Sequence, residues 1–174
     1  MLSGVEIRAR RRADFEPVLM VARATKALDD YPPRGPLDVD HFLTPPEGLA
    51  AWVAEADDTV VGHVALHRVG TDDATQLAAA HAGKTPQDLV LVARLLVSPT
   101  ARRTGVGRAL LGTAVQSAHE RGRQPILGVA THLEAAISLY QSCGWDRAGA
   151  VTIPIDDEPD LAVYLYVGPA PADG

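Results

Sequence analysis

The sequence predicts an α/β (α+β) fold with a mixed sheet, and three observations support this. Short apolar or alternating segments typical of strands recur between longer segments with helical periodicity. Two pairs of neighbouring strand segments are separated by short polar turns, which predicts antiparallel hairpins. In residues 89–130 a strand, a helix and another strand follow one another, which predicts a parallel crossover.

The N-terminal half of the chain is expected to begin with a strand and a helix and to continue through an irregular segment into a hairpin. Asp14 can cap the helix, because its side chain can accept a hydrogen bond from a free backbone amide. Five prolines between residues 29 and 48 remove backbone donors, so we expect this segment to be irregular apart from one short helical stretch. The expected elements lie at residues 4–8, 14–27, 38–43, 50–55 and 59–69.

The C-terminal half contains the crossover and the second hairpin. The run LVLVARLLV at residues 89–97 is almost wholly apolar, which predicts a strand buried on both faces. An alanine-rich helix before it is expected to be capped by Asp72 or Asp73 and to end at Gly83. The expected elements lie at residues 74–82, 89–98, 105–121, 125–130, 131–143, 148–155 and 161–167.

The composition is that of a single globular domain. The 174 residues are 47% hydrophobic and 22% charged, which excludes wholesale disorder. We expect one domain over residues 1–167 and a mobile tail at 168–174. Cys143 is the one cysteine, so an intrachain disulfide and a cysteine-based zinc site are excluded, and no metal is expected.

The charge and hydropathy of the chain bear on its partners. Its net charge of −6 is opposite in sign to that of a general nucleic-acid binder, so no nucleic-acid partner is expected. No apolar run approaches the length of a membrane-spanning helix, and the first residues lack the apolar core of a secretory signal. We therefore expect a cytoplasmic protein with no membrane partner, and a single cysteine fits a reducing compartment.

A basic, glycine-containing loop after the central strand predicts a phosphate site. Gly105 and Gly107 leave room for backbone to approach an anion, and the start of the next helix offers free amides and a favourable dipole. A dinucleotide fingerprint is excluded because Leu110 stands where a third glycine is needed, and the Gly-Lys-Ser/Thr of a Walker loop is absent. Three arginines surround the loop, so the ligand that suits it best is a pyrophosphate.

Two motifs in this region resemble those of a known family. RLLVSP followed by Arg102-x-x-Gly105-x-Gly107 resembles the pyrophosphate loop of the GNAT superfamily of N-acetyltransferases. The run AAISLYQSCGW at residues 135–145 is similar to the following helix of that family, where an Ala-Ile-x-Leu-Tyr run ends in glycine and an aromatic residue. The order and lengths of the elements match the family from about residue 4 to residue 167.

The resemblance implies a fold, a co-substrate and a set of site residues. The fold would be a mostly antiparallel sheet of six to seven strands with helices on both faces and a V-shaped splay between the central strands. The co-substrate would be acetyl-CoA, and Tyr140 matches the family's general acid, which protonates the departing thiolate. The positions that would hold the pantetheine arm and the pyrophosphate are Leu95, Leu96, Val97, Arg102, Arg103, Thr104, Gly105, Val106, Gly107 and Arg108.

The general base is less well defined by the sequence. Many family members use a glutamate on the central strand, but residues 89–97 contain no carboxylate. His63 and His67 lie two residues apart on one strand face, and histidine has a pKa suited to proton transfer at neutral pH. Either is a candidate base or simply a solvent-facing strand residue, and Asp88 and His132 are weaker options.

These observations predict an enzyme that transfers an acetyl group from acetyl-CoA to a primary amine of a small molecule or peptide. The alternatives are a non-catalytic CoA-binding regulatory module and a transferase with an unusual acyl donor or acceptor. Residues 29–48 and 70–87 are expected to shape the acceptor pocket, and four aspartates could attract a cationic acceptor. These are Asp29, Asp30, Asp38 and Asp40. A homodimer is left open, since dimers are common in such families.

Overall fold

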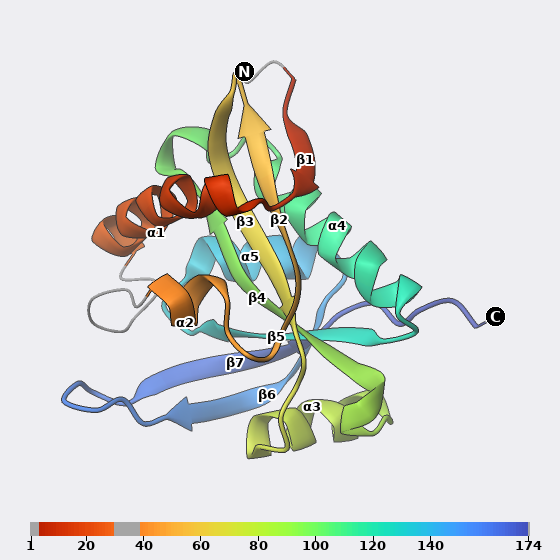
Figure 1. Ribbon diagram of the computed structural model, residues 1–174. Coiled ribbons are helices and arrows are strands. Elements are labelled where there is room, and N and C mark those ends of the chain that lie inside the picture. The colour runs from red at the N-terminus through yellow and green to blue at the C-terminus, as the bar shows by residue number, and fades with distance from the viewer. Residues whose placement is uncertain (1–3, 30–38, 174) are drawn as a thin grey trace. The chain divides into compact units, whose positions relative to one another are not determined.

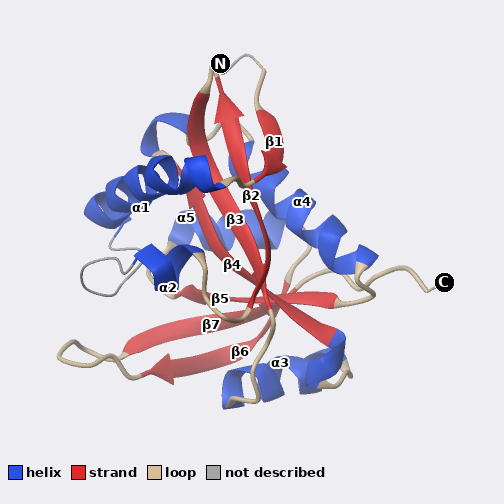
Figure 2. Ribbon diagram, viewed as in Figure 1, coloured by secondary structure: helices blue, strands red, loops and turns tan. Residues whose placement is uncertain are grey.

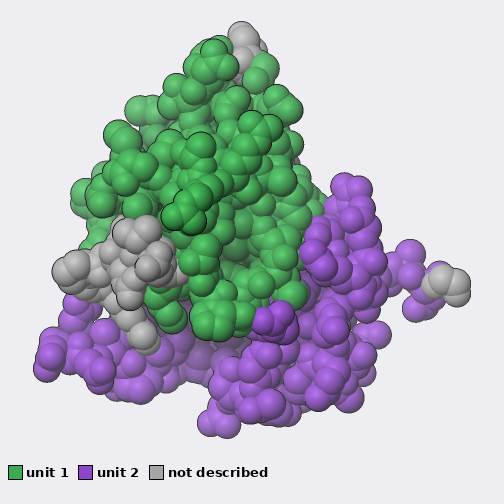
Figure 3. All heavy atoms as spheres, in the orientation of Figure 1, with its two compact units in different colours: residues 1–67, 93–114 green, residues 68–92, 115–174 purple. Residues whose placement is uncertain are grey.

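The computed structural model describes residues 4–29 and 39–173 (Figure 1). The chain divides into two compact units (Figure 3), which we call unit 1 (residues 1–67 and 93–114) and unit 2 (residues 68–92 and 115–174). Each unit is therefore assembled from two separate stretches of chain. Among the described residues, no helix is long and apolar enough to cross a membrane.

The strands form one seven-stranded sheet in the order β1-β2-β3-β4-β5-β7-β6 (Figure 2). The strands are β1 (Glu6–Ala9), β2 (Gly48–Ala56), β3 (Thr59–His67), β4 (Leu89–Val97), β5 (Gln124–Ala130), β6 (Asp146–Ile153) and β7 (Leu161–Val167). β1–β2, β2–β3, β5–β7 and β6–β7 pair antiparallel, and β4–β5 pair parallel. The predicted mixed, mostly antiparallel sheet with one parallel crossover is confirmed.

The helices fall close to the segments predicted from the sequence. They are α1 (Phe15–Asp29), α2 (Val39–Leu43), α3 (Asp73–Ala82), α4 (Val106–Glu120) and α5 (Glu134–Ser142). Short 3₁₀ turns lie at η1 (Arg12–Asp14), η2 (Pro86–Asp88) and η3 (Pro99–Ala101). The parallel pairing of β4 with β5 joins Leu89–Leu91 to Gln124–Ile126, at the start of each strand.

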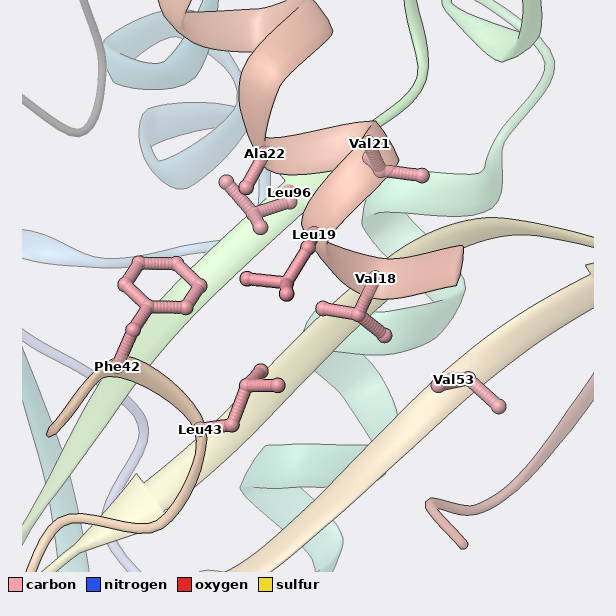
Figure 4. Packing of buried hydrophobic residues seen from close by; sticks show 8 residues of the cluster. All are labelled: Val18, Leu19, Val21, Ala22, Phe42, Leu43, Val53 and Leu96. Atoms are coloured by element: carbon pink, nitrogen blue, oxygen red, sulfur yellow. The ribbon is translucent and has the colours of Figure 1, made fainter. Parts of the chain in front are cut away.

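The core of unit 1 lies between α1, α2 and the strands (Figure 4). Val18, Leu19, Val21 and Ala22 recur at helical spacing, so they place one apolar face of α1 against the sheet. Burial of such a face, at about 25 cal/mol per Å² of apolar area, supplies most of the stability of a helix of this length. The other buried members of this core are Phe42, Leu43, Val53 and Leu96.

The start of α1 differs from the sequence prediction. Asp14, expected as the helix cap, lies instead in the 3₁₀ turn η1, and both of its carboxylate oxygens accept hydrogen bonds from Arg8 at 2.8 Å. Arg8 also donates to Glu55 on β2 at 2.6 Å. One guanidinium therefore ties β1, η1 and β2 together, and its hydrogen bonds hold the pKa of the Asp14 carboxyl below its usual range.

In unit 2, α3 packs against the strand pair β6–β7. The predicted caps are confirmed: the Asp72 side chain accepts from the Thr75 amide at 3.0 Å, and Gly83 ends the helix in a left-handed conformation with φ of 65°. The buried apolar residues that meet here are Ala78, Ala79, Leu89, Ile126 and Val167.

At Gly62, β3 lies so close to β4 and α4 that a side chain should not fit. A Cβ added there would lie 2.8 Å from Leu110 Cδ1 and 3.0 Å from the Leu96 carbonyl oxygen, which is backbone and cannot turn away. We therefore expect Gly62→Ala to lower the free energy of unfolding by about 1–3 kcal/mol. Gly112→Ala is the matched control, because a Cβ on that helical glycine meets nothing within 4 Å and should stabilise α4 by about 0.5–1 kcal/mol. Urea unfolding curves measure both, and equal effects would contradict the prediction.

Candidate active site

The loop between β4 and α4 passes through two left-handed residues into the start of a helix. After Val97 the Ser98 amide donates to the Val61 carbonyl at 2.8 Å, which fixes the end of β4 against β3. Arg103 and Gly105 then adopt left-handed conformations, with φ of 60° and 87°, and turn the chain into α4. A helix leaves its first N–H groups without acceptors inside the helix, so the start of α4 presents free donors and the positive end of its dipole.

The surroundings of this loop suit a phosphate. Arg103, Gly105 and Arg108 are exposed, whereas Val106 is buried and anchors the first turn of α4. A Cβ added at Gly105 would meet nothing within 4 Å, so the space beside the loop is open. The loop therefore has free space beside Gly105, and the buried side chain of Val106 holds its other end in the protein interior.

Arg102 has a partner within the chain that the sequence did not indicate. Its guanidinium donates through both Nη atoms to the carboxylate of Asp29, the last residue of α1. The pair is about one third exposed on each side, so solvent reaches it. Asp29, one of the four aspartates expected to attract a cationic acceptor, is therefore neutralised by Arg102. The structural placement of Asp30, Asp38 and the Asp40 side chain lies outside the described residues.

The central strand β4 contains one residue, Arg94, with a left-handed backbone conformation. Arg94 lies in the middle of β4 with φ of 56°, a left-handed conformation that costs a non-glycine residue of order 1–3 kcal/mol. Its carbonyl oxygen lies 2.8 Å from Nδ1 of His63, and its guanidinium lies 4.7 Å from the centre of the Phe42 ring. The three residues after Arg94, expected to pair with pantetheine, continue β4 in extended form.

The two ring nitrogens of His63 are both engaged. Arg10 Nη1 lies 3.0 Å from Nε2, and because a guanidinium can only donate, Nε2 is the acceptor. Nδ1 then carries the proton and donates to the Arg94 carbonyl. The side chain is fully buried, and burial, together with the charges of Arg10 and Arg94, lowers its pKa to about 4. His63 is therefore a neutral histidine held in one tautomer.

His67 has a different environment on the same strand face. It is 4% exposed, and within the described part of the chain its ring makes no hydrogen bond. Burial is the largest cause that lowers its pKa to about 4, and Arg94 and Arg10 lower it further, while Glu47 acts in the opposite direction. Of the two histidines predicted as the base, His67 is the one whose lone pair is not already committed.

Tyr140 belongs to unit 2, where it is part of an aromatic cluster. It lies on α5 and is buried, with its ring centre 6.0 Å from that of Trp145 and 6.1 Å from that of Tyr166. Arg147 donates from Nε and Nη2 to the Tyr166 hydroxyl at 3.2 and 3.0 Å. These tilted contacts fix the plane of the Tyr140 ring.

The weaker candidates for the base have local roles. Asp88 is exposed and accepts from both the amide and the hydroxyl of Thr85, so it caps the turn η2. His132 is exposed just before α5. Among the residues that the structure describes, no group of three or more His, Cys, Asp or Glu side chains is placed to hold a metal ion.

The comparisons with known proteins agree with the fold and give the family. The family described as the acetyltransferase (GNAT) family matches residues 14–145, more than half of the chain, and the protein belongs to that family. Human N-acetyltransferase 8 is 31% identical over 113 residues, and rat N-acetyltransferase family 8 member 3 is 35% identical over 99 residues. The matches cover 64% and 56% of this chain but only 45% and 39% of those relatives, so the chain spans less than half of their length.

Solved structures show the same fold at low sequence identity. The ribosomal-protein-S18-alanine N-acetyltransferase from Escherichia coli superposes with a TM-score of 0.72 at 19% identity, over 98% of this chain and 97% of that one. Arabidopsis thaliana NAA60 in complex with acetyl-CoA superposes with a TM-score of 0.73 at 19% identity, over 94% and 97% of the two chains. At this identity the likeness establishes the fold.

The contacts of Arg10 and Arg94 with His63 were not predicted from the sequence. Arg94 is the one ionisable residue in an otherwise apolar strand, and this could have drawn attention to it. Nothing local in the sequence indicates that Arg10 reaches His63, 53 positions away.

The neutral state of His63 makes a prediction about pH and stability. In the unfolded chain the pKa of a histidine is near 6.5, whereas in the folded protein the pKa of His63 is about 4. Between these values the unfolded state binds more protons, so the free energy of unfolding should fall as the pH falls from about 6.5 towards 4. Between pH 7.5 and pH 5 the contribution of His63 should be about 2 kcal/mol.

Urea unfolding of the parent protein and of His63→Gln at both pH values measures this effect. Glutamine can donate and accept but does not titrate, so the variant should lose less stability on acidification. His81→Gln removes an exposed histidine of α3 and serves as the matched control. The same loss in His63→Gln as in the parent would show that His63 does not remain neutral.

Proposed function

We propose that the protein is an N-acetyltransferase that transfers the acetyl group of acetyl-CoA to a primary amine of a small molecule or peptide by direct attack. The observation that carries the proposal is the loop of residues 102–108, where two left-handed residues lead into a helix N-terminus that would suit an anion, in a chain of the GNAT family. The names of the related proteins support acetyl transfer to nitrogen, and one solved relative contains acetyl-CoA.

The loop would hold the pyrophosphate of the co-substrate. The amides from Arg103 to Arg108 supply donors, and the exposed guanidinium groups of Arg103 and Arg108 supply positive charge. Arg102 would contribute by exchanging Asp29 for a phosphate oxygen. The main-chain groups of Leu95, Leu96 and Val97 would hydrogen-bond the pantetheine arm. Bound acetyl-CoA supplies the activated acyl group, and the chain supplies orientation and proton transfer.

We assign the general base to His67 rather than to His63. With a pKa of about 4, the His67 ring is unprotonated at neutral pH and can accept a proton. A base this weak needs an amine that releases its proton readily. The two arginines that lower the pKa of His67 also disfavour the ammonium form of an amine beside it, so they would promote this release.

Tyr140 is the proposed general acid. A phenol has a pKa near 10 and can protonate a thiolate while remaining neutral itself at pH 7. The contacts of its ring with Trp145 and Tyr166 restrict the positions that its hydroxyl can take. A rigid donor of this kind contributes through orientation as well as through acidity.

A CoA-binding regulatory module remains the second candidate. It is favoured by the lack of a carboxylate in β4, the strand on which many family members carry their base. Thiol release from acetyl-CoA over a panel of amines separates the two functions, because the module would bind CoA without turnover.

The loop makes a prediction about CoA affinity. If backbone at Gly107, in the first turn of α4, approaches a phosphate, Gly107→Val should raise the dissociation constant of CoA at least about tenfold. Gly112→Val is the matched control, because it introduces the same side chain into α4 at a position where a Cβ meets nothing within 4 Å. Calorimetric titration with CoA measures both variants. Equal affinities would remove the basis for a CoA site.

The assignment of Tyr140 makes a prediction about turnover. Tyr140→Phe keeps the ring contacts and removes the hydroxyl, so kcat should fall by about 10²–10⁴-fold while CoA affinity changes little. Tyr164→Phe, whose ring stacks on Arg147, is the control for loss of a hydroxyl in unit 2. Single-turnover rates should accompany kcat, because a slow later step would hide part of the loss. Full turnover by Tyr140→Phe would assign the ring to packing alone.

A further inference from the structure

Arg94 is held in a strained conformation within an otherwise regular strand. Its φ of 56° is left-handed, although the eight other residues of β4 are apolar and none of them is glycine. Strain of this kind persists only where the surrounding structure enforces it, and it gathers at binding and catalytic sites. Here the Arg94 carbonyl accepts a hydrogen bond from the buried His63, which is one of the contacts that hold this residue.

The Arg94 side chain has donors that the chain does not use. Its guanidinium carbon lies over the ring of Phe42 on α2, at 4.7 Å from the ring centre, so the ring restricts where the guanidinium can lie. Its Nε is buried and has no hydrogen-bond partner. Within residues 4–29 and 39–173 the guanidinium makes no ion pair and no hydrogen bond. A buried N–H without a partner is unfavourable, and a hydrogen-bond acceptor on a ligand would remove this cost.

The charges around Arg94 leave an excess of positive charge. Arg10 is a second permanent cation, but its guanidinium is committed to His63 and to the Leu43 carbonyl. Among the groups that act on His67, Arg94, Arg10 and His41 lower its pKa, and Glu47 alone among the charged groups raises it. Two guanidinium groups and one carboxylate thus act on His67, and a bound anion would balance the excess positive charge.

We propose that Arg94 binds a carboxylate of the acceptor, so that the acceptor is an amine that also carries a carboxylate, such as a free amino acid. A guanidinium forms two parallel hydrogen bonds to a carboxylate, and the contact with the Phe42 ring limits the movement of the Arg94 side chain. The inference rests on the proposed acetyl transfer and names its substrate class. It differs from the expectation of a cationic acceptor attracted by aspartates.

The test compares acceptors that differ only in the carboxylate. Thiol release from acetyl-CoA is measured with each of a panel of free amino acids, with the corresponding amino acid amides and with the decarboxylated amines. The parent protein should prefer at least one free amino acid over its amide by roughly 10- to 100-fold in kcat/KM, the scale of a hydrogen-bonded charge pair. Aminoalkyl phosphates in the same panel distinguish a phosphate site from a carboxylate site.

Substitutions then assign the preference to this side chain. Arg94→Gln should reduce the ratio of the two kcat/KM values towards one, and Arg94→Lys should keep part of it because the charge remains. Arg23→Gln removes an exposed arginine of α1 and should leave the ratio unchanged. Turnover without a carboxylate preference, a preference for phosphates, or a preference that survives in Arg94→Gln would each overturn the inference but leave the proposed function intact.

A binding measurement keeps the inference testable if no amine is turned over. Calorimetric titration of the CoA-saturated protein with N-acetylamino acids and with their amides requires no catalysis. The carboxylates should bind more tightly to the parent protein than to Arg94→Gln, whereas the amides should not discriminate. Equal binding of both probes by the parent would overturn the inference. Thermal melts of each variant confirm that it is folded.

Discussion

A neutral imidazole between two arginines holds the middle of β4 in place. His63 accepts a hydrogen bond from Arg10 and donates one to the carbonyl of Arg94, so a single ring joins the segment after β1 to the central strand. A third positive charge at this buried position would be costly, and this keeps the ring neutral. The residue whose carbonyl accepts this hydrogen bond is also the left-handed residue of β4, so His63 contacts the strand at its most unusual point.

The same arrangement separates the roles of two histidines that look equivalent in the sequence. His63 and His67 are two residues apart on one face of β3, and both are buried. His63 donates a hydrogen bond to the Arg94 carbonyl and accepts one from Arg10, so both of its ring nitrogens are engaged and it maintains structure. The second keeps its lone pair in a region made electropositive by two arginines, where an amine would lose its proton readily.

The parts of the fold that depend on local pattern could be predicted from the sequence, and those set by distant contacts could not. Apolar periodicity located the strands and helices within a few residues, because it directly reflects which face is buried. The glycines of residues 102–108 indicated the turn into α4 for the same local reason, and the binding of an anion there stays a prediction. The left-handed conformation of Arg94 gave no such signal, and the histidine that hydrogen-bonds its carbonyl lies 31 positions away in the sequence. The ion pairs that Arg8 forms with Asp14 and with Glu55, 47 positions away, likewise have no local signal in the sequence.

The contact between Arg102 and Asp29 shows how such a loop can be ordered before a ligand arrives. The pair joins residues 73 positions apart and is open to solvent on both sides. Exposed ion pairs contribute about 0–1 kcal/mol, so breaking this one would cost little. A phosphate group carries more charge than Asp29 and would also receive the free amides at the start of α4, so the exchange favours the ligand. Asp29 thus holds the Arg102 side chain in one position in the free protein. It would compete only weakly with a pyrophosphate for the Arg102 guanidinium.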